Sequence, residues 1–503
     1  MKNRIVSVML IFAFVLSIIA CKKSFFEATT NDGSINDGTG YKTKESFDAG
    51  VAGAYVNLQS AVEPLITLPA YISKDIEPGG APTPYDVFFS SGYTFSAQQW
   101  RELYKIINNA NIVIEKLEGV APGILTDEEK KKAMGQVKFL RGFAYLHLTQ
   151  AFGDIPMPLE SYSDALNSIS CTPQAGVITQ VISDLTEAAA NLPEAMEWGS
   201  ADLGRVGKGA ALGYLVLANM YKLDWPAAAA AAERLFALTK PKYELKADVR
   251  QEFSALNRNL SSSVFEIQFN PKSGNKWVGW GGSGSPDNGH IMATQTSPPG
   301  VGDRWTSFGG WGSLAITPTV LNRFEPGDDR RKKLLIKYPE PYKGELMTDS
   351  FNAQHWPTDP DFLNRRTDFG YSTKYWYGPS PLPAGENIVM MRFAEVLLNY
   401  AEIQFNRGQH ADAYAQLNKI RERAKLPPRP VSTNKETFMT DLMNERRLET
   451  LMEPGFWYHL TRTGRAANFL KDNYNITMLP QWKHTPIPST ERDINPNLCS
   501  NGY

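Results

Sequence analysis

Exposed aromatic rings beside hydrogen-bonding groups are expected in a glycine-rich stretch of this chain. Trp277 and Trp280 lie among glycines, and Asp287 and Asn288 follow shortly after them. Sugars present flat, apolar C–H faces edged with hydroxyl groups, so a surface that binds them needs open rings next to planar hydrogen-bond partners. Glycines beside a tryptophan leave the face of the ring uncovered by neighbouring side chains. This pattern predicts a carbohydrate-binding surface.

More residues of the same type surround this stretch. Arg304, Trp305 and Trp311 follow it, and a second aromatic cluster contains Tyr85 and Phe88. The alternative for each ring is that it packs its own loop onto the scaffold, which covers about 150–250 Å² of apolar surface. The predicted ligand-binding residues are Trp277, Trp280, Asp287, Asn288, Arg304, Trp305, Trp311, Tyr85 and Phe88.

The sequence carries no established signature of catalysis. It has no GxSxG elbow, no Walker loop and no HExxH motif. Its histidines are scattered without metal-ligand spacing. No EF-hand loop occurs either, so calcium binding has no supporting motif, although other calcium sites stay open. A glycosidase pair of carboxylates, such as Asp287 with Asp303, also stays open because it is defined by distance in space. We therefore predict a chain that is not an enzyme and needs no cofactor or metal.

The first residues have the pattern of a bacterial lipoprotein signal. A short basic segment with Lys2 and Arg4 precedes an apolar run, and Ala20 stands directly before Cys21. The run is too short for a membrane span, which needs about 20 apolar residues. We predict a signal peptide over residues 1–20 and acylation of Cys21, which would anchor the chain to a membrane.

A polar segment rich in glycine follows the predicted anchor, and we interpret residues 21–43 as a flexible tether. The remaining residues 44–503 are expected to form one body, with an N-terminal part near 44–250 and a C-terminal part near 260–503. The net charge of −1 gives no electrostatic reason to expect nucleic-acid binding. Cys171 and Cys499 either form a disulfide or remain free thiols.

Local signals predict that this body is mainly α-helical. Thr126 and Glu129 form a capping box that starts a helix with apolar residues at three- and four-residue steps. Gly153 is expected to end that helix. Thr172 and Pro173 predict the cap and the first position of the next helix.

Further helices are expected in antiparallel pairs. The predicted spans are 208–223, a run after Pro226, 388–407, 411–424 and 438–452. Ala401, Gly408 and Ala413 fall where tetratricopeptide repeats place small residues, which allow two helices to approach closely. Helix pairs that each bury one face must stack on their neighbours. The predicted fold class is a mainly α, tetratricopeptide-like superhelix of helix pairs.

Two long stretches, 270–317 and 339–385, break this helical pattern. They are rich in Gly, Pro, Asn and aromatic residues, and they are too long for ordinary connections. Their tryptophans argue against disorder. We interpret them as ordered excursions laid over the helical scaffold, with a few short strands such as 264–269.

Several segments, in order along the chain, resemble the blocks of the SusD/RagB family. They are the asparagine-rich stretch 108–114, residues 139–156 with Phe139-Leu140-Arg141-Gly142 and Phe152-Gly153-Asp154-Ile155-Pro156, residues 387–402, Asn444-Glu445-Arg446-Arg447 with 460–464, and the C-terminal stretch 486–503. The chain departs from the family pattern at Pro454, at His459, where an aspartate is common, and at Cys499-Ser500.

The resemblance implies a lipoprotein at the outer-membrane surface of a Bacteroidetes-type bacterium. Its relatives bind an oligosaccharide, or in some cases a peptide, and pass it to a SusC-like TonB-dependent barrel transporter. The same function in polysaccharide utilisation is expected here. The alternatives are a surface glycoside hydrolase or lyase on a helical scaffold, a peptide-binding protein, and a lid of the transporter that has no ligand of its own.

The charged residues in these blocks have a different predicted role. They lie among apolar helix positions, where a charge is stable only when it is paired. We expect them to form partly buried ion contacts that fix helix packing and not to contact the ligand. They are Arg141, Arg392, Glu395, Glu402, Glu445 and Arg446.

Overall fold

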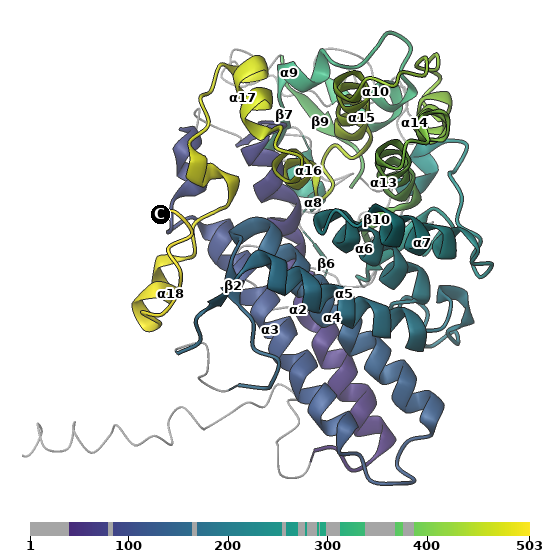
Figure 1. Cartoon of the computed structure of the whole chain (residues 1–503), viewed down its shortest axis with the longest axis vertical. Coiled ribbons are helices and arrows are strands. Elements are labelled where there is room, and N and C mark those ends of the chain that lie inside the picture. Colours follow the sequence, from purple (N-terminus) through teal and green to yellow (C-terminus); the bar gives the residue numbers. More distant parts are fainter. Residues whose placement is uncertain are drawn as a thin grey trace, which may run out of the picture.

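The computed structural model describes residues 40–78, 84–162, 168–253, 258–269, 277–278, 289–290, 292–297, 312–337, 368–375 and 387–503. It is mainly helical, as predicted (Figure 1). The N-terminal helices are α2 (Lys44–Ile72), α3 (Thr94–Glu118), α4 (Asp127–Phe152), α5 (Gln174–Asn191), α6 (Lys208–Tyr221) and α7 (Trp225–Phe236). Each of them packs against the next along the chain, which is the expected arrangement of stacked helix pairs.

The C-terminal helices are α13 (Phe393–Asn406), α14 (His410–Arg423), α15 (Lys435–Glu449), α16 (Phe456–Arg462), α17 (Ala466–Tyr474) and α18 (Ser489–Ile494). Short α-helices are α8 (Met292–Thr296), α9 (Pro318–Leu321) and α10 (Asp329–Leu334), and 3₁₀ turns are η2 (Tyr85–Phe89), η4 (Ala195–Glu197), η5 (Val249–Phe253) and η6 (Pro480–Lys483). Helices α13 and α14 pack together as predicted, with Ala401 and Ala413 fully buried and Gly408 in the left-handed conformation at φ 79°.

Short strands link segments that are far apart in the sequence. One antiparallel sheet has the order β1 (Ile76–Pro78), β7 (Leu314–Ile316), β9 (Gly370–Ser372) and β8 (Leu335–Lys337). The two-stranded pairs are β4 (Ser263–Ile267) with β10 (Ile388–Arg392), β2 (Ile155–Pro156) with β3 (Cys171–Thr172), and β5 (Trp277–Val278) with β6 (Gly289–His290). The predicted strand near 264–269 is confirmed as β4.

The predicted ends of α4 are confirmed. The Thr126 hydroxyl accepts a hydrogen bond from the Glu129 amide at 3.2 Å, and the Thr126 amide donates to the Glu129 carboxylate at 2.9 Å. Gly153 ends the helix with φ 77°. The predicted start of α5 is wrong by one position, because Thr172 belongs to β3. The first helical amide, at Gln174, donates instead to the Asp154 carboxylate at 2.9 Å.

The prediction of a helix over 388–407 is wrong in its first residues. Ile388–Arg392 forms strand β10, with Ile388 opposite Ile267 of β4, and α13 begins only at Phe393. A short apolar run does not distinguish a buried strand from a buried helix, and the partner strand lies far upstream in the sequence.

The C-terminal segment returns to the N-terminal helices. The Thr485 amide donates to the carbonyl of Ala151 at 2.7 Å, and Asn501 donates to the carbonyl of Phe152 at 3.0 Å. Cys171 and Cys499 form a disulfide, a pairing that the sequence left open. Within the described ranges, no helix has the length and apolar character needed to cross a membrane.

Candidate functional site

Most of the predicted ligand-binding residues lie outside the described part of the chain. These are Trp280, Asp287, Asn288, Arg304, Trp305 and Trp311, and the predicted acylation site Cys21 lies outside it as well. For Trp277 the structure describes the backbone, which lies in β5 with Trp277 opposite Gly289 of β6. The role of these residues in ligand binding stays a prediction.

Tyr85 and Phe88 lie together in η2, next to the C-terminal end of α2. The Tyr85 hydroxyl donates to the carbonyl of Ile72 at 2.6 Å, and the ring is half-buried. Phe88 is only 3% exposed, and its ring stacks on Tyr71 with the ring centroids 5.2 Å apart. Phe88 therefore packs its loop onto the scaffold, which is the alternative to ligand binding that was given for these rings. The binding role of Tyr85 stays a prediction.

The described parts of the glycine-rich excursion meet along the C-terminal half of α2. Strand β7 pairs with β1, which places Leu314 opposite Pro78. The side chain of Gln295 in α8 donates to the carboxylate of Glu63 in α2, and the Gly312 amide donates to the Ser297 carbonyl at 2.8 Å. The chain on either side of the predicted aromatic residues is thus held against one helix.

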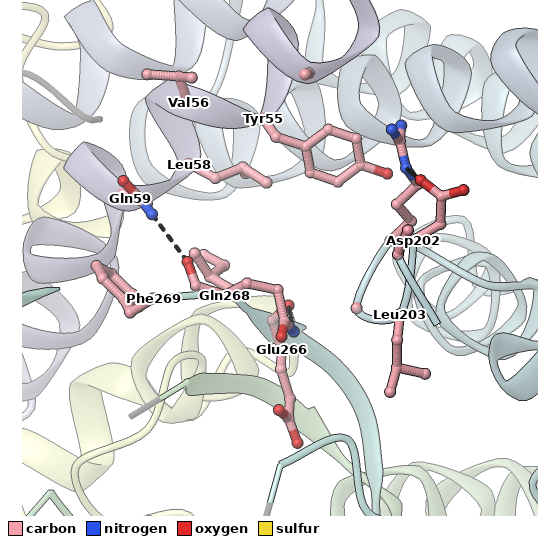
Figure 2. A pocket seen from close by; sticks show the side chains of 14 residues that line it. Tyr55, Val56, Leu58, Gln59, Asp202, Leu203, Glu266, Gln268 and Phe269 are labelled. Atoms are coloured by element: carbon pink, nitrogen blue, oxygen red, sulfur yellow. Dashed lines mark hydrogen bonds and ion pairs between the residues drawn. The ribbon is translucent and has the colours of Figure 1, made fainter. Parts of the chain in front are cut away.

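A groove is present further back along α2, which we call the α2–β4 groove (Figure 2). Residues 52–59 of α2, the turn 201–205, and residues 266–269 of β4 and its exit line it, and its cavity volume is about 300 Å³. Figure 2 shows Tyr55 and Leu58 on one side, Gln268 and Phe269 below them, and Leu203 across the opening. Leu203 is 52% exposed, so the groove is open to solvent at this wall.

Internal hydrogen bonds hold the polar groups of the groove in place. The Tyr55 hydroxyl donates to Gln136 Oε1 at 3.1 Å and accepts from the Val206 amide at 3.2 Å. Burial raises the pKa of this hydroxyl well above its ordinary value, so it stays protonated. Arg205 Nε donates to Asp202 Oδ1 at 2.7 Å, and Arg205 Nη1 donates to Gln136 Oε1 at 3.1 Å. These residues form a rigid rim.

Sequence reasoning did not find this groove. Its walls come from three segments that are remote in the sequence, and none of them carries a ligand-binding motif. The apolar run of β4 is the one local feature of the groove that the sequence shows. Such a run predicts a buried strand as readily as the wall of a groove.

The charged residues of the family blocks pair in the interior, as predicted. Arg141 makes a bidentate pair with Asp184, both bonds measuring 2.8 Å. Glu402 pairs with Arg462 at 2.7 Å. Glu445 accepts from Arg421 at 2.9 Å.

Arg392 is the centre of a larger buried cluster, which we call the ion-pair hub. The hub consists of Arg392, Glu252, Glu449, Glu453, Arg423, Arg330 and Lys374. Arg392 is 1% exposed and lies 2.6 Å from Glu252 and 2.7 Å from both Glu449 and Glu453. Burial by itself lowers the pKa of Arg392, but the surrounding carboxylates raise it well above its ordinary value. The hub is a structural element, because its members are buried and occupied with one another.

Glu395 and Arg446 pair less completely than predicted. Both face His459: Arg446 Nη1 lies 3.2 Å from His459 Nε2, and Glu395 Oε1 lies 3.8 Å from it. Burial lowers the pKa of His459 well below its ordinary value, so the imidazole is neutral at physiological pH. Burial also raises the pKa of Glu395 to about 7.

No metal centre is evident where side chains are described, since no group of three or more His, Cys, Asp or Glu residues there could hold an ion. The side chains that line the α2–β4 groove offer amide and charged groups for hydrogen bonding, beside apolar surface.

Comparison with known proteins identifies the family. Residues 262–503 match the family described as SusD family, and residues 88–221 match the one described as starch-binding associating with outer membrane. SusD-like protein P38 of Formosa agariphila is 25% identical over 98% of this chain and 99% of its own.

Solved structures agree in fold. A laminarin-binding SusD-like protein superposes with a TM-score of 0.75 at 23% identity, over 92% of this chain and 100% of its own. Surface glycan-binding protein A from Bacteroides thetaiotaomicron, in complex with laminarihexaose, superposes with a TM-score of 0.73 at 24% identity, also over 92% and 100%. The two family matches lie in order along the chain, and they show that it belongs to the SusD/RagB family.

Proposed function

We propose that this protein is a cell-surface lipoprotein that binds a glycan without modifying it and passes it to a TonB-dependent outer-membrane transporter. Membership of the SusD/RagB family supports the proposal most directly. Two relatives that share the fold over 92% of this chain bind laminarin or laminarihexaose. A binding protein needs a rigid scaffold and a ligand surface but no catalytic group, in agreement with the lack of catalytic motifs in the sequence.

The proposed location follows from the N-terminus and the family. The pattern that ends at Ala20-Cys21 favours cleavage and acylation, and the description of one matched family includes association with the outer membrane. An acyl anchor contributes about 0.8 kcal/mol per buried methylene. A single acyl chain therefore binds a membrane only weakly, and stable attachment of the protein needs more than one acyl chain.

The convergence of segments at the C-terminal end of α2 supports a single ligand face there. The β1–β7 pairing joins the chain just before Tyr85 to the chain just after Trp311, although these residues are far apart in the sequence. Helix α8, between the two predicted tryptophan clusters, packs on the C-terminal half of α2, where Gln295 contacts Glu63. Aromatic residues from both sequence regions would then contribute to one surface, on which several rings together hold an extended glycan.

Affinity electrophoresis tests this proposal. The soluble protein, lacking residues before Lys22, is run through native gels that contain laminarin, starch, xylan or another polysaccharide from a panel. Retardation by at least one polysaccharide is expected. It should be lost in the double variant Trp277→Ala/Trp280→Ala and retained in Trp225→Ala, which changes a half-buried tryptophan at the start of α7.

Two outcomes would contradict the proposal. If no polysaccharide retards the protein, glycan binding is excluded for the panel and a peptide ligand or a ligand-free lid is favoured. If incubation with the retarding polysaccharide releases new reducing ends, the protein is an enzyme.

A further inference from the structure

The α2–β4 groove has the shape and the surface of a small ligand site. Its volume of about 300 Å³ lies at the lower end of the range for small-molecule pockets, about 300–1,000 Å³, and suits one or two sugar rings. The groove lies on the N-terminal side of the segments that form the ligand face proposed above. Gln59 precedes Glu63, which α8 contacts, by about one helical turn, and it precedes Ile72, near β1 and η2, by roughly 20 Å at about 1.5 Å per residue.

Tyr55 provides a flat surface in a fixed orientation. Its hydroxyl is bonded on one side to Gln136 and on the other to Val206, and these two hydrogen bonds fix the position of the hydroxyl and the long axis of the ring. The ring is only half-buried, and Leu203 stands across the opening (Figure 2). An apolar face about as large as a sugar ring can pack against this surface.

A donor and an acceptor lie side by side at the rim. Asp202 uses Oδ1 and Arg205 uses Nε for their mutual bond at 2.7 Å. Among the residues that the structure describes, Asp202 Oδ2 and Arg205 Nη2 have no further partner. The side chains of Asp202 and Arg205 are 44% and 24% exposed, so both reach solvent at the rim. Neighbouring hydroxyl groups on one sugar ring match such a pair, since each can donate and accept.

The polar groups of Asp202 and Arg205 at the rim favour a sugar over an apolar side chain of a peptide. An aliphatic or aromatic side chain of a peptide would cover Asp202 and Arg205 without replacing their hydrogen bonds to water, which costs free energy. A sugar replaces those bonds with its own hydroxyl groups. The lining of the groove holds two carboxylates, Asp202 and Glu266, and one guanidinium, Arg205, which favours an uncharged saccharide over an anionic one.

We propose that the α2–β4 groove is a second carbohydrate site, which takes one or two rings of a neutral saccharide. This inference rests on the proposed function in that it assumes a sugar as the ligand. A second site of this kind would hold a long glycan at two points, so that the effective concentration at each site rises when the other is occupied.

Saturation-transfer NMR with maltose, cellobiose and laminaribiose tests the groove alone when the aromatic loops are disabled. All proteins carry Trp277→Ala/Trp280→Ala as background. In this background at least one disaccharide should still give a signal. Adding Ala52→Trp, which fills the groove from the exposed face of α2, or Asp202→Ala, which removes the acceptor, should weaken binding by about tenfold, equal to about 1.4 kcal/mol.

The matched control is Ala411→Trp, an exposed alanine near the start of α14, which should leave the signal unchanged. Absence of a signal for all three disaccharides in the background, or a signal that Ala52→Trp and Asp202→Ala leave unchanged, would overturn the second site. Neither result bears on the proposed function, because retardation of the parent protein by a polysaccharide is measured separately. Failure of that retardation overturns the proposed function instead.

Discussion

The N-terminal and C-terminal helices bury charge to different extents. Helices α2 to α5 follow one another in the sequence and join mainly through apolar side chains, with Asn111, Arg141 and Asp184 as a buried polar contact between α3, α4 and α5. The ion-pair hub instead joins η5, α10, β10, α14 and α15, which come from distant parts of the chain. Apolar contacts are non-directional. They are sufficient to hold two helices together where a short connection already determines which helices are neighbours. Bidentate ion pairs are directional, and here they specify which distant segments dock together.

Removing Arg392 should have the largest effect on stability. Arg392→Leu leaves the carboxylates of Glu252, Glu449 and Glu453 buried with fewer partners, which is expected to cost about 3–5 kcal/mol or to prevent folding. Urea unfolding followed by circular dichroism measures the free energy, and soluble yield reports a failure to fold.

Arg141→Leu is the matched change among the N-terminal helices. It also removes a buried arginine, but it leaves only one carboxylate, that of Asp184, and the amide oxygen of Asn111 without this donor. Asp184 keeps Lys138 Nζ at 3.6 Å and Gln180 Nε2 at 3.1 Å. The loss of stability should therefore be smaller than for Arg392→Leu. Equal losses in the two variants would show that the hub is not more critical than a single buried pair, and the comparison between the two regions would fail.

Glu395 gives the next largest effect, and it depends on pH. Its pKa is raised by burial from 4.5 to about 7 in the folded protein, although Arg446 acts in the opposite direction. Below pH 4.5 the carboxyl is protonated in both folded and unfolded chains, and its contribution to stability is fully present. As pH rises towards 7 the unfolded chain loses the proton first, so stability falls, and above pH 7 the loss is complete.

Glu395→Gln removes this titration while keeping the shape of the side chain. Relative to the parent protein, the variant should gain on the order of 2 kcal/mol of unfolding free energy at pH 8 and much less at pH 5. Urea unfolding at both values measures the difference. A variant that is less stable than the parent at pH 8 would mean that Glu395 is ionised and properly paired, like the carboxylates of the hub.

The sequence predicted what local chemistry determines. The capping box at Thr126 and the stop at Gly153 are set by neighbouring residues, and both are confirmed. The charged residues of the family blocks are expected to form ion pairs because isolated buried charges are unstable. The sequence alone does not show which residues pair with them. Arg392 meets Glu252 only after the chain has folded. For the same reason the sequence predicts a helix at Ile388, where the structure has strand β10.

The candidate site was less predictable than the fold. Whether an aromatic ring is open to a ligand depends on what packs over it, and two residues of η2 differ in this respect: Tyr85 is half-buried, whereas Phe88 is buried and stacks on Tyr71. The α2–β4 groove needs three remote segments to exist at all. Composition predicts that rings and amides bind sugars, but only tertiary packing decides which of them are free to do so.

The smallest effect is expected at an exposed ion pair of the C-terminal helices. Arg465 and Glu436 lie only 2.6 Å apart, as close as Arg392 and Glu252 in the hub, but their side chains are 23% and 76% exposed. Water solvates both charges when the pair is broken, so Arg465→Ala should change the unfolding free energy by about 1 kcal/mol or less. Urea unfolding at low and high salt measures it. A loss as large as that of Arg392→Leu would mean that separation, and not burial, determines how much these pairs stabilise the protein.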